Sequence, residues 1–189
     1  MTTARRLHYS YREYLRALED SEMKLEFHDG TIYAMAGGTV AHAALSASAT
    51  RIIGQLLLGR CTAFSSDLKI RIESTDLATF PDGSIVCGAH EHSPIDEHAL
   101  VNPSILVEVT SRSTEDYDRS EKLSHYKQIP SLRAVLFVSH RTRCITIVRR
   151  AATGWQEQDV RSGEHVELTE PKLRFAVDEL YEGITLDPS

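Results

Sequence analysis

The spacing of apolar residues predicts four helices. Apolar positions recur every three to four residues from Val40 to Leu58, and Gly59 directly after them is a typical C-cap. Ser10 with Glu13 matches a capping box, which predicts a helix that begins at the next residue. The expected helices cover residues 11–19, 40–58, 113 or 114 to 129, and 177–181.

Short apolar or alternating runs between turn residues predict strands. Asp29-Gly30 separates two such runs and favours a hairpin with a tight type I′ turn. The expected strands cover residues 24–28, 31–35, 62–64, 68–73, 84–87, 104–110, 134–138, 144–148, 155–160 and 165–168, and the polar segment 88–103 is expected to be a loop. This order predicts an α/β fold with a central mixed β-sheet flanked by helices.

Length and composition fit a single domain over residues 1–189. No stretch approaches the roughly 20 apolar residues that span a bilayer, so we expect no membrane association. The first residues contain no apolar signal core, which favours a cytoplasmic location. The net charge of -6 argues against DNA binding by a broad basic face, but not against a metal-dependent nuclease.

The three cysteines are expected to be reduced core thiols. Cys61, Cys87 and Cys144 are an odd number, lie far apart and occur within apolar segments. This distribution is not typical of a disulfide framework or of a zinc site. His90, His92 and His98 are irregularly spaced in a polar loop and are expected to be solvated.

Two carboxylates stand in or next to apolar runs, where an isolated charge is costly to bury. Asp82 precedes the run 83–87, and Glu108 interrupts the run 105–109. Strand alternation places Glu108 on the face opposite Val107 and Val109. If the two strands are neighbours, both carboxylates can reach one hard divalent cation. The alternative is a turn residue at Asp82 and a solvated edge position at Glu108.

Lys122 and Glu26 are the next candidates. Lys122 and Tyr126 are four residues apart and share one face of the expected helix. A lysine directed at two acids could stabilise the charge of a transferring phosphate, whereas the alternative is a surface lysine paired with Asp118. The Glu26 side chain points to the face of its strand opposite Leu25 and Phe27, and it could equally be exposed to solvent. His42 and Asp67 have sufficient structural explanations and rank lower.

The motifs occur in an order that resembles a known family. They are Lys24 to Gly30, Ala36-Gly37-Gly38, His42, Ser66-Asp67-Leu68, Phe80-Pro81-Asp82, Val107 to Ser111, Ser113-Thr114, Asp118, Lys122, Tyr126 and Ile129 to Leu132. In this order they resemble the Uma-two family of restriction endonucleases, within the PD-(D/E)XK nuclease-like superfamily. The resemblance runs from about Tyr11 to Gly183. The lysine that the superfamily motif has two residues after the second acid is replaced here by Thr110, and the family implies that Lys122 supplies it.

The resemblance implies a restriction-endonuclease-like core and metal-assisted hydrolysis of phosphodiester bonds. Mg²⁺ or Mn²⁺ would be held by Asp82, Glu108 and the Val109 carbonyl, with Lys122 and Glu26 as the other catalytic residues. The expected partner is nucleic acid, and DNA in particular, with a homodimer to cut both strands. Two alternatives stay open at this point. One is a non-catalytic binding or assembly protein on the same fold, and the other is a metal-dependent hydrolase of small phosphate esters.

Overall fold

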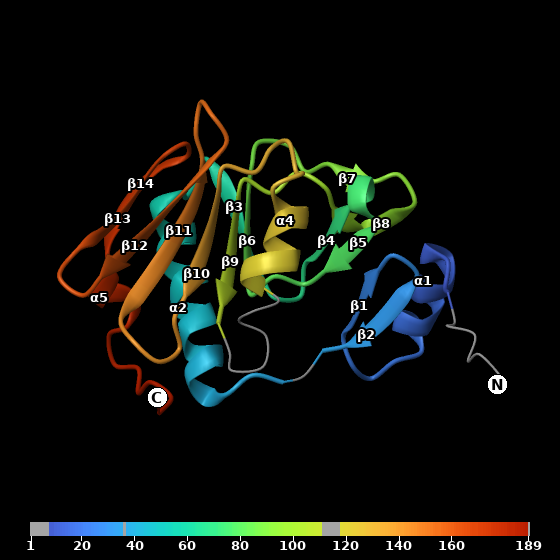
Figure 1. Cartoon of the computed structure of the whole chain (residues 1–189), viewed down its shortest axis with the longest axis horizontal. Helices are drawn as coiled ribbons and strands as arrows, with labels where there is room; N and C mark the ends of the chain where they lie inside the picture. Colours follow the sequence, from blue (N-terminus) through green and yellow to red (C-terminus); the bar gives the residue numbers. More distant parts are fainter. Residues whose placement is uncertain (1–7, 36, 111–117, 189) are drawn as a thin grey trace.

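The computed structural model describes residues 8–35, 37–110 and 118–188 and has a mixed α/β architecture (Figure 1). Two six-stranded sheets lie side by side, and each contains parallel and antiparallel pairs. The helical segments are α1 (Tyr11–Glu19), α2 (Val40–Leu56), η1 (Glu73–Thr75), η2 (Asp118–Lys122), α4 (Leu123–Tyr126) and α5 (Val177–Leu180). The predicted fold class is therefore confirmed, and the second large sheet is an addition that the sequence did not indicate.

The first sheet has the order β2-β1-β5-β4-β8-β7. Its strands are β1 (Leu25–His28), β2 (Thr31–Ala34), β4 (Lys69–Ile72), β5 (Leu77–Thr79), β7 (His92–Ser93) and β8 (Asp96–Leu100). Helix α1 packs on this sheet through Tyr11 and Tyr14, which contact Phe27. All four residues of β4 are buried. Its two charged residues, Lys69 and Arg71, lie over the rings of Tyr14 and Tyr11 of α1, whereas its two isoleucines belong to the core cluster that includes α4.

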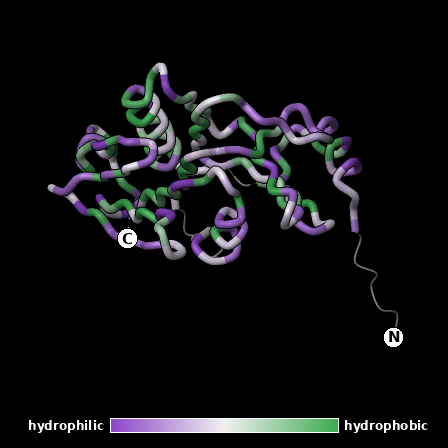
Figure 2. The backbone as a smooth tube through the Cα atoms, turned by 90° about the horizontal axis from the view of Figure 1, so that it is seen from above, coloured by the Kyte–Doolittle hydropathy of each residue, from purple (hydrophilic) through white to green (hydrophobic). Residues whose placement is uncertain are grey.

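The second sheet has the order β12-β11-β10-β9-β6-β3. Its strands are β3 (Cys61–Ser65), β6 (Gly83–Cys87), β9 (Ile105–Val109), β10 (Ala134–Val138), β11 (Cys144–Arg150) and β12 (Trp155–Arg161), and the hairpin of β13 (His165–Thr169) and β14 (Lys172–Ala176) follows them. The two central strands, β9 and β10, are parallel and buried throughout, as expected for a sheet covered on both faces. In Figure 2 much of the outer chain is hydrophilic, while a few hydrophobic residues, among them Leu56 and Leu58, are also exposed.

The two faces of the second sheet are covered by different helices. Side chains of Ile105, Val107 and Val109 pack with the apolar face of α2, whereas Leu106 packs with α4. Thr39 caps the N-terminus of α2 by accepting a hydrogen bond from the His42 amide at 3.1 Å. The strand alternation predicted for 105–109 is thus observed, and it directs Glu108 to the α4 side.

Most predicted elements are present with small shifts at their ends. The capping box of Ser10 and Glu13 begins α1, and the Asp29-Gly30 turn joins β1 to β2. The expected helix up to residue 129 ends at Tyr126, and its predicted start at Ser113 or Thr114 lies outside the described residues. Strands β5 and β14 were not predicted, although each directly follows a turn; β5 has only three residues.

The expectation of a loop over residues 88–103 is wrong. This segment forms β7 and β8, and β8 pairs parallel to β4 while β7 forms the edge of the first sheet. Polar residues dominate it because one of its faces is exposed, and His90, His92 and His98 are indeed exposed. The sequence of residues 88–103 lacks the alternation of apolar and polar residues by which strands are recognised.

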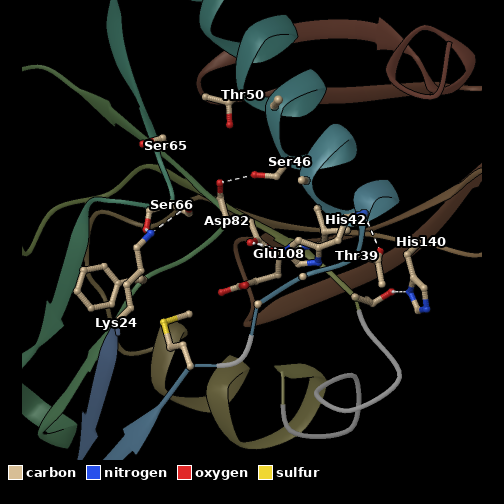
Figure 3. A pocket seen from close by; sticks show the side chains of 18 of the residues that line it. Lys24, Thr39, His42, Ser46, Thr50, Ser65, Ser66, Asp82, Glu108 and His140 are labelled. Carbon is tan, nitrogen blue, oxygen red and sulfur yellow. Dashed lines mark hydrogen bonds and ion pairs between the residues drawn. The ribbon is translucent and has the colours of Figure 1, made fainter. Parts of the chain in front are cut away.

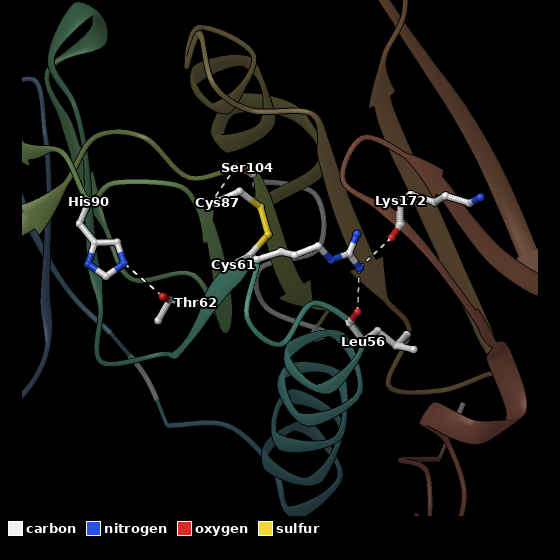
Figure 4. Close-up of a disulfide and its surroundings, with 8 residues drawn as sticks. Leu56, Cys61, Thr62, Cys87, His90, Ser104 and Lys172 are labelled. Carbon is white, nitrogen blue, oxygen red and sulfur yellow. Dashed lines mark hydrogen bonds between the residues drawn. A yellow bond between two sulfur atoms is a disulfide. The ribbon is translucent and has the colours of Figure 1, made fainter.

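The expectation of three reduced cysteines is also wrong. Cys61 and Cys87 form a disulfide, and Cys144 is a buried free thiol (Figure 4). The antiparallel pairing of β3 with β6 places Cys61 directly opposite Cys87. The separation of 26 residues in the sequence concealed this proximity, because the pairing of the two strands could not be inferred from their composition.

No helix in the part of the chain that the structure describes is long and apolar enough to cross a membrane.

Candidate active site

Glu108 lies in the middle of the second sheet and is 4% exposed. Its strand, β9, is bordered by β6 and β10, so the alternative of a solvated edge position does not apply. The Tyr126 hydroxyl donates a hydrogen bond to Glu108 Oε1, and Lys122 Nζ lies 3.0 Å from the same oxygen. Burial, together with the neighbouring Glu108 carboxylate, raises the pKa of the Tyr126 phenol well above its usual value, which keeps this group a donor.

Lys122 reaches the site from the junction of η2 and α4. It is 5% exposed, and Tyr126 one turn later points to the same side of the helix. Its ammonium group lies between two carboxylates, 3.0 Å from Glu108 Oε1 and 3.6 Å from Glu26 Oε1. The alternative of a surface lysine therefore does not hold, since this side chain is buried between two acids.

Glu26 belongs to β1 of the first sheet, so the site joins the two sheets. Its Oε1 accepts hydrogen bonds from the Thr79 hydroxyl and, at 3.4 Å, from the Phe80 amide. Its side chain is 14% exposed, which places it in the interior and not on the solvent-facing surface that the sequence also allowed. All of these described contacts use one carboxylate oxygen, so Oε1 is held in place.

Asp82 precedes β6, in the antiparallel register that pairs Gly83 with Val107. Its carboxylate therefore opposes Glu108 on the neighbouring strand. The Val109 amide donates a hydrogen bond to Asp82 Oδ2 at 2.7 Å, and His42 Nε2 lies 2.9 Å from Oδ1. These contacts hold Asp82 between β9 and the first turn of α2.

Gly83 permits the close approach of α2 that brings His42 to Asp82. A Cβ atom at this position would lie 2.8 Å from Thr50 Oγ1 and 3.4 Å from the Val107 Cβ. Ser46, one turn after His42, donates its hydroxyl to the Asp82 carbonyl at 2.9 Å. A side chain at residue 83 would force the Thr50 side chain or α2 itself to move.

The four predicted catalytic residues, Glu26, Asp82, Glu108 and Lys122, all line one cavity of about 1340 Å³. Figure 3 shows Asp82 and Glu108 on its wall. The cavity lies between the two sheets, beside the N-terminal half of α2. Val109, the predicted carbonyl ligand, also lines it, and its amide is the group that holds Asp82. No described residue of the segment 88–103 contributes to the cavity wall.

His42 is the site residue to which sequence reasoning gave too little weight. A histidine in the first turn of a helix is common, and nothing in the sequence indicated that α2 would pack against the start of β6. The signal that was available is Gly83, a residue without a side chain next to an acid at the head of a buried strand. Asp67, ranked with His42, lies 2.7 Å from Lys24 Nζ in an exposed ion pair and is not one of the lining residues.

The donor atoms of this cavity suit a hard divalent cation. Glu26, Asp82 and Glu108 provide three carboxylates in a partly buried wall, where the Lys122 ammonium group and the His42 imidazole contact them. Mg²⁺ and Mn²⁺ prefer carboxylate and carbonyl oxygens, and a carboxylate that accepts hydrogen bonds retains lone pairs for a metal. The residues present therefore fit such an ion.

The chain belongs to the Uma2 family, whose model, described as "Putative restriction endonuclease", matches residues 11–178. Uncharacterized protein slr1290 of Synechocystis sp. is 36% identical over 177 residues, which are 93% of this chain and 92% of the relative. Uncharacterized protein sll1609 of the same organism is 29% identical over 128 residues, 67% of this chain and 72% of the relative.

A solved structure has the same fold. It is a crystal structure from Anabaena variabilis, described as "a putative nuclease belonging to DUF820", with a TM-score of 0.74 and 16% sequence identity. The match covers 92% of this chain and 98% of the other. The resemblance of the sequence to the Uma-two family is thereby confirmed, and the fold that it implied is shared with this neighbour.

Proposed function

We propose that this protein is a metal-dependent endonuclease that hydrolyses phosphodiester bonds of nucleic acid, DNA in particular. The observation that carries the proposal is Lys122, a buried ammonium group placed between Glu26 and Glu108 on the wall of a large cavity. Membership in a family named for restriction endonucleases supports the same reaction class. Asp82, Glu108 and the Val109 carbonyl would hold Mg²⁺ or Mn²⁺, which supplies a Lewis acid and lowers the pKa of a bound water.

The other catalytic roles, charge stabilisation and orientation of the carboxylates, fall to residues of the chain itself. Lys122 would stabilise the negative charge that develops on the phosphate oxygens, and its burial makes this electrostatic stabilisation stronger than it would be in water. Tyr126 and the Val109 amide orient Glu108 and Asp82, respectively. Glu26 balances the charge of Lys122 and can accept a proton from an attacking water within the cavity. His42, held against Asp82, would fix the orientation of that carboxylate.

The size and lining of the cavity favour a polymer over a small phosphate ester. Pockets for small molecules commonly measure about 300–1,000 Å³, and this cavity is larger at about 1340 Å³. Lys24 and Arg51 line its rim in addition to Lys122. Arg51 is exposed on α2 and is suited to a phosphate of the nucleic-acid backbone, the contact that supplies most sequence-independent affinity.

The proposal is tested by incubating the full chain with supercoiled plasmid, linear duplex and single-stranded DNA in the presence of Mg²⁺ or Mn²⁺. We expect cleavage that stops when the metal is chelated and that is lost in Asp82→Ala. Glu97→Gln is a matched control, because this exposed carboxylate of β8 lies outside the cavity. Equal cleavage by Asp82→Ala would refute the site, and hydrolysis of small phosphate esters alone would favour the smaller substrate class.

Many enzymes that cut both strands act as twofold dimers, so we propose a homodimer. We also propose that the protein acts in the cytoplasm. Sedimentation of the purified chain, with and without duplex DNA, tests the dimer directly.

A further inference from the structure

A second group of metal-ligating side chains lies outside the cavity. His28, Glu121 and His125 each offer one ligand atom, and the three atoms lie within 4.8 Å of one another. His28 ends β1, whereas Glu121 and His125 belong to η2 and α4. Glu121 and His125 are four residues apart and therefore share one face of the helical segment. None of the three residues lines the cavity of the proposed active site.

The spacing of these atoms suits a tetrahedral ion. Zinc bonds to nitrogen and oxygen measure about 2.0–2.2 Å, so two ligands of a tetrahedral site stand about 3.4 Å apart. His28 Nδ1 and Glu121 Oε1 are separated by 3.4 Å. The two imidazole rings have centroids 4.5 Å apart at an interplanar angle of 73°. Small rotations of His125 would complete three protein ligands, and solvent could occupy the fourth position because Glu121 is half exposed.

The surroundings of His125 give a second, independent indication. Within the described part of the chain, its Nδ1 atom is buried and makes no hydrogen bond. A buried polar atom that makes no hydrogen bond carries a cost in stability. Coordination of a cation by this atom would remove that cost. An ion pair of His28 with Glu121 alone would leave it unsatisfied.

We infer that His28, Glu121 and His125 form a binding site for a divalent transition metal of the zinc class. The two imidazoles are borderline donors, and their presence beside one carboxylate selects Zn²⁺ or Co²⁺ over Mg²⁺. The ion would connect β1 to the η2–α4 segment. Glu26 lies two residues before His28, and Lys122 directly follows Glu121, so the same ion would fix the distance between these two side chains. The site does not depend on the proposed cleavage reaction.

The test is a titration of the metal-free full chain with Co²⁺, followed by visible absorption, and with Zn²⁺, followed by calorimetry. Excess Mg²⁺ is present to occupy the carboxylate site. We expect about one equivalent of Co²⁺ per chain, with affinity reduced at least 10-fold in His125→Gln and in His28→Gln, in line with the loss of a ligand. His98→Gln, an exposed histidine of β8, is the matched control and should bind as the wild type does.

Two further measurements separate this site from the cavity. Glu108→Gln should retain the Co²⁺ band, because its change lies in the other site. Zn²⁺ should also raise the melting temperature of the wild type and not of His125→Gln, since only a folded chain presents the three ligands together. Equal Co²⁺ binding by wild type and His125→Gln, or loss of the band in Glu108→Gln, would overturn the inference. Co²⁺ binding by the wild type, together with the reduced affinity of His28→Gln and His125→Gln, would support the inference whether or not the protein cleaves DNA.

Discussion

Among the described residues, two buried clusters are built from the same three groups, a lysine, a carboxylate and a tyrosine. In the first sheet, Lys69 Nζ lies 2.7 Å from Asp96 Oδ2, which also accepts the Tyr11 hydroxyl at 2.6 Å. In the second sheet, Lys122 and the Tyr126 hydroxyl contact Glu108 in the same way. Lys69 and Lys122 are each 5% exposed. A buried triad of this composition therefore does not by itself identify a catalytic site.

The difference lies in what surrounds each triad. Near Asp96, the Arg71 side chain pairs with Asp76 and stacks on the Tyr11 ring with its guanidinium carbon 4.0 Å from the ring centroid. The named charges of this network thus balance, and none of its residues lines the cavity. Around Glu108, two more carboxylates, from Glu26 and Asp82, face the same cavity. Acidic groups on a cavity wall can reach a substrate and indicate chemistry, whereas charges packed beneath α1 and away from the cavity indicate structure.

The largest expected effect is a contrast between two variants. Glu108→Gln should lose activity, whereas Asp96→Asn should lose stability. Glu108→Gln removes a metal-binding charge and should lower cleavage by about 100-fold or more while the chain stays folded. Asp96→Asn leaves the Lys69 charge without a compensating partner and should lower the free energy of unfolding by about 3 kcal/mol. Cleavage by the folded fraction of Asp96→Asn should stay normal.

Cleavage rates and urea unfolding of both variants measure the two quantities side by side. A Glu108→Gln protein that cleaves normally would show that both triads are structural.

A smaller effect is expected when the tyrosines are compared. Tyr126→Phe and Tyr11→Phe each remove one hydroxyl that donates to a buried carboxylate. A hydrogen bond to a charged group contributes about 1.5–3 kcal/mol, so both variants should lose stability in this range. Only Tyr126→Phe should also lose activity, by roughly 10-fold, because Glu108 is then less well oriented. Steady-state rates at saturating Mn²⁺ distinguish the two, and an equal loss in both would remove the functional distinction.

The smallest expected effect is a loss of stability at low pH that arises from Asp96 in the first-sheet network. Burial raises the pKa of Asp96, but the hydrogen bonds from Lys69 and Tyr11 outweigh it and hold this pKa below the ordinary value of 3.8. A carboxyl with a lowered pKa in the folded state contributes stability that is present above its unfolded value and is lost as pH falls through its folded value. The stability difference between wild type and Asp96→Asn should therefore be constant from pH 7 to 5 and shrink below pH 4, by at most about 1.4 kcal/mol per pH unit.

Denaturant unfolding at pH 7, 5, 4 and 3 measures this difference, with Glu97→Gln as an exposed control. A difference that stays constant down to pH 3 would contradict the role given to Asp96.

The sequence predicted the second-sheet cluster better than the first-sheet network. Glu108 was recognisable because it interrupts an apolar run, and Lys122 because it shares a helix face with Tyr126. Lys69 and Arg71 alternate with apolar residues, which is typical of a strand whose polar side faces solvent. Their burial results from the packing of α1 on the first sheet, a long-range contact that leaves no local pattern.

Long-range contacts account for the other differences as well. The contact between His42 and Asp82 depends on how closely α2 approaches β6, and the Cys61–Cys87 bond depends on which strands pair. Neither follows from the spacing of residues along the chain. The metal ligands, the dimer and the cytoplasmic location stay predictions.

The parallel pairing of β9 with β10 also determines when the site can form during synthesis. Glu108 lies opposite Phe137 in this pairing, so β9 has only one of its two neighbouring strands until about 30 further residues have been made. Chains fold as they emerge from the ribosome, at roughly 5–20 residues per second. Glu26, Asp82 and Glu108 are thus all translated before the strand that completes their framework. A nascent chain would acquire its acidic cavity late, after both sheets have assembled around it.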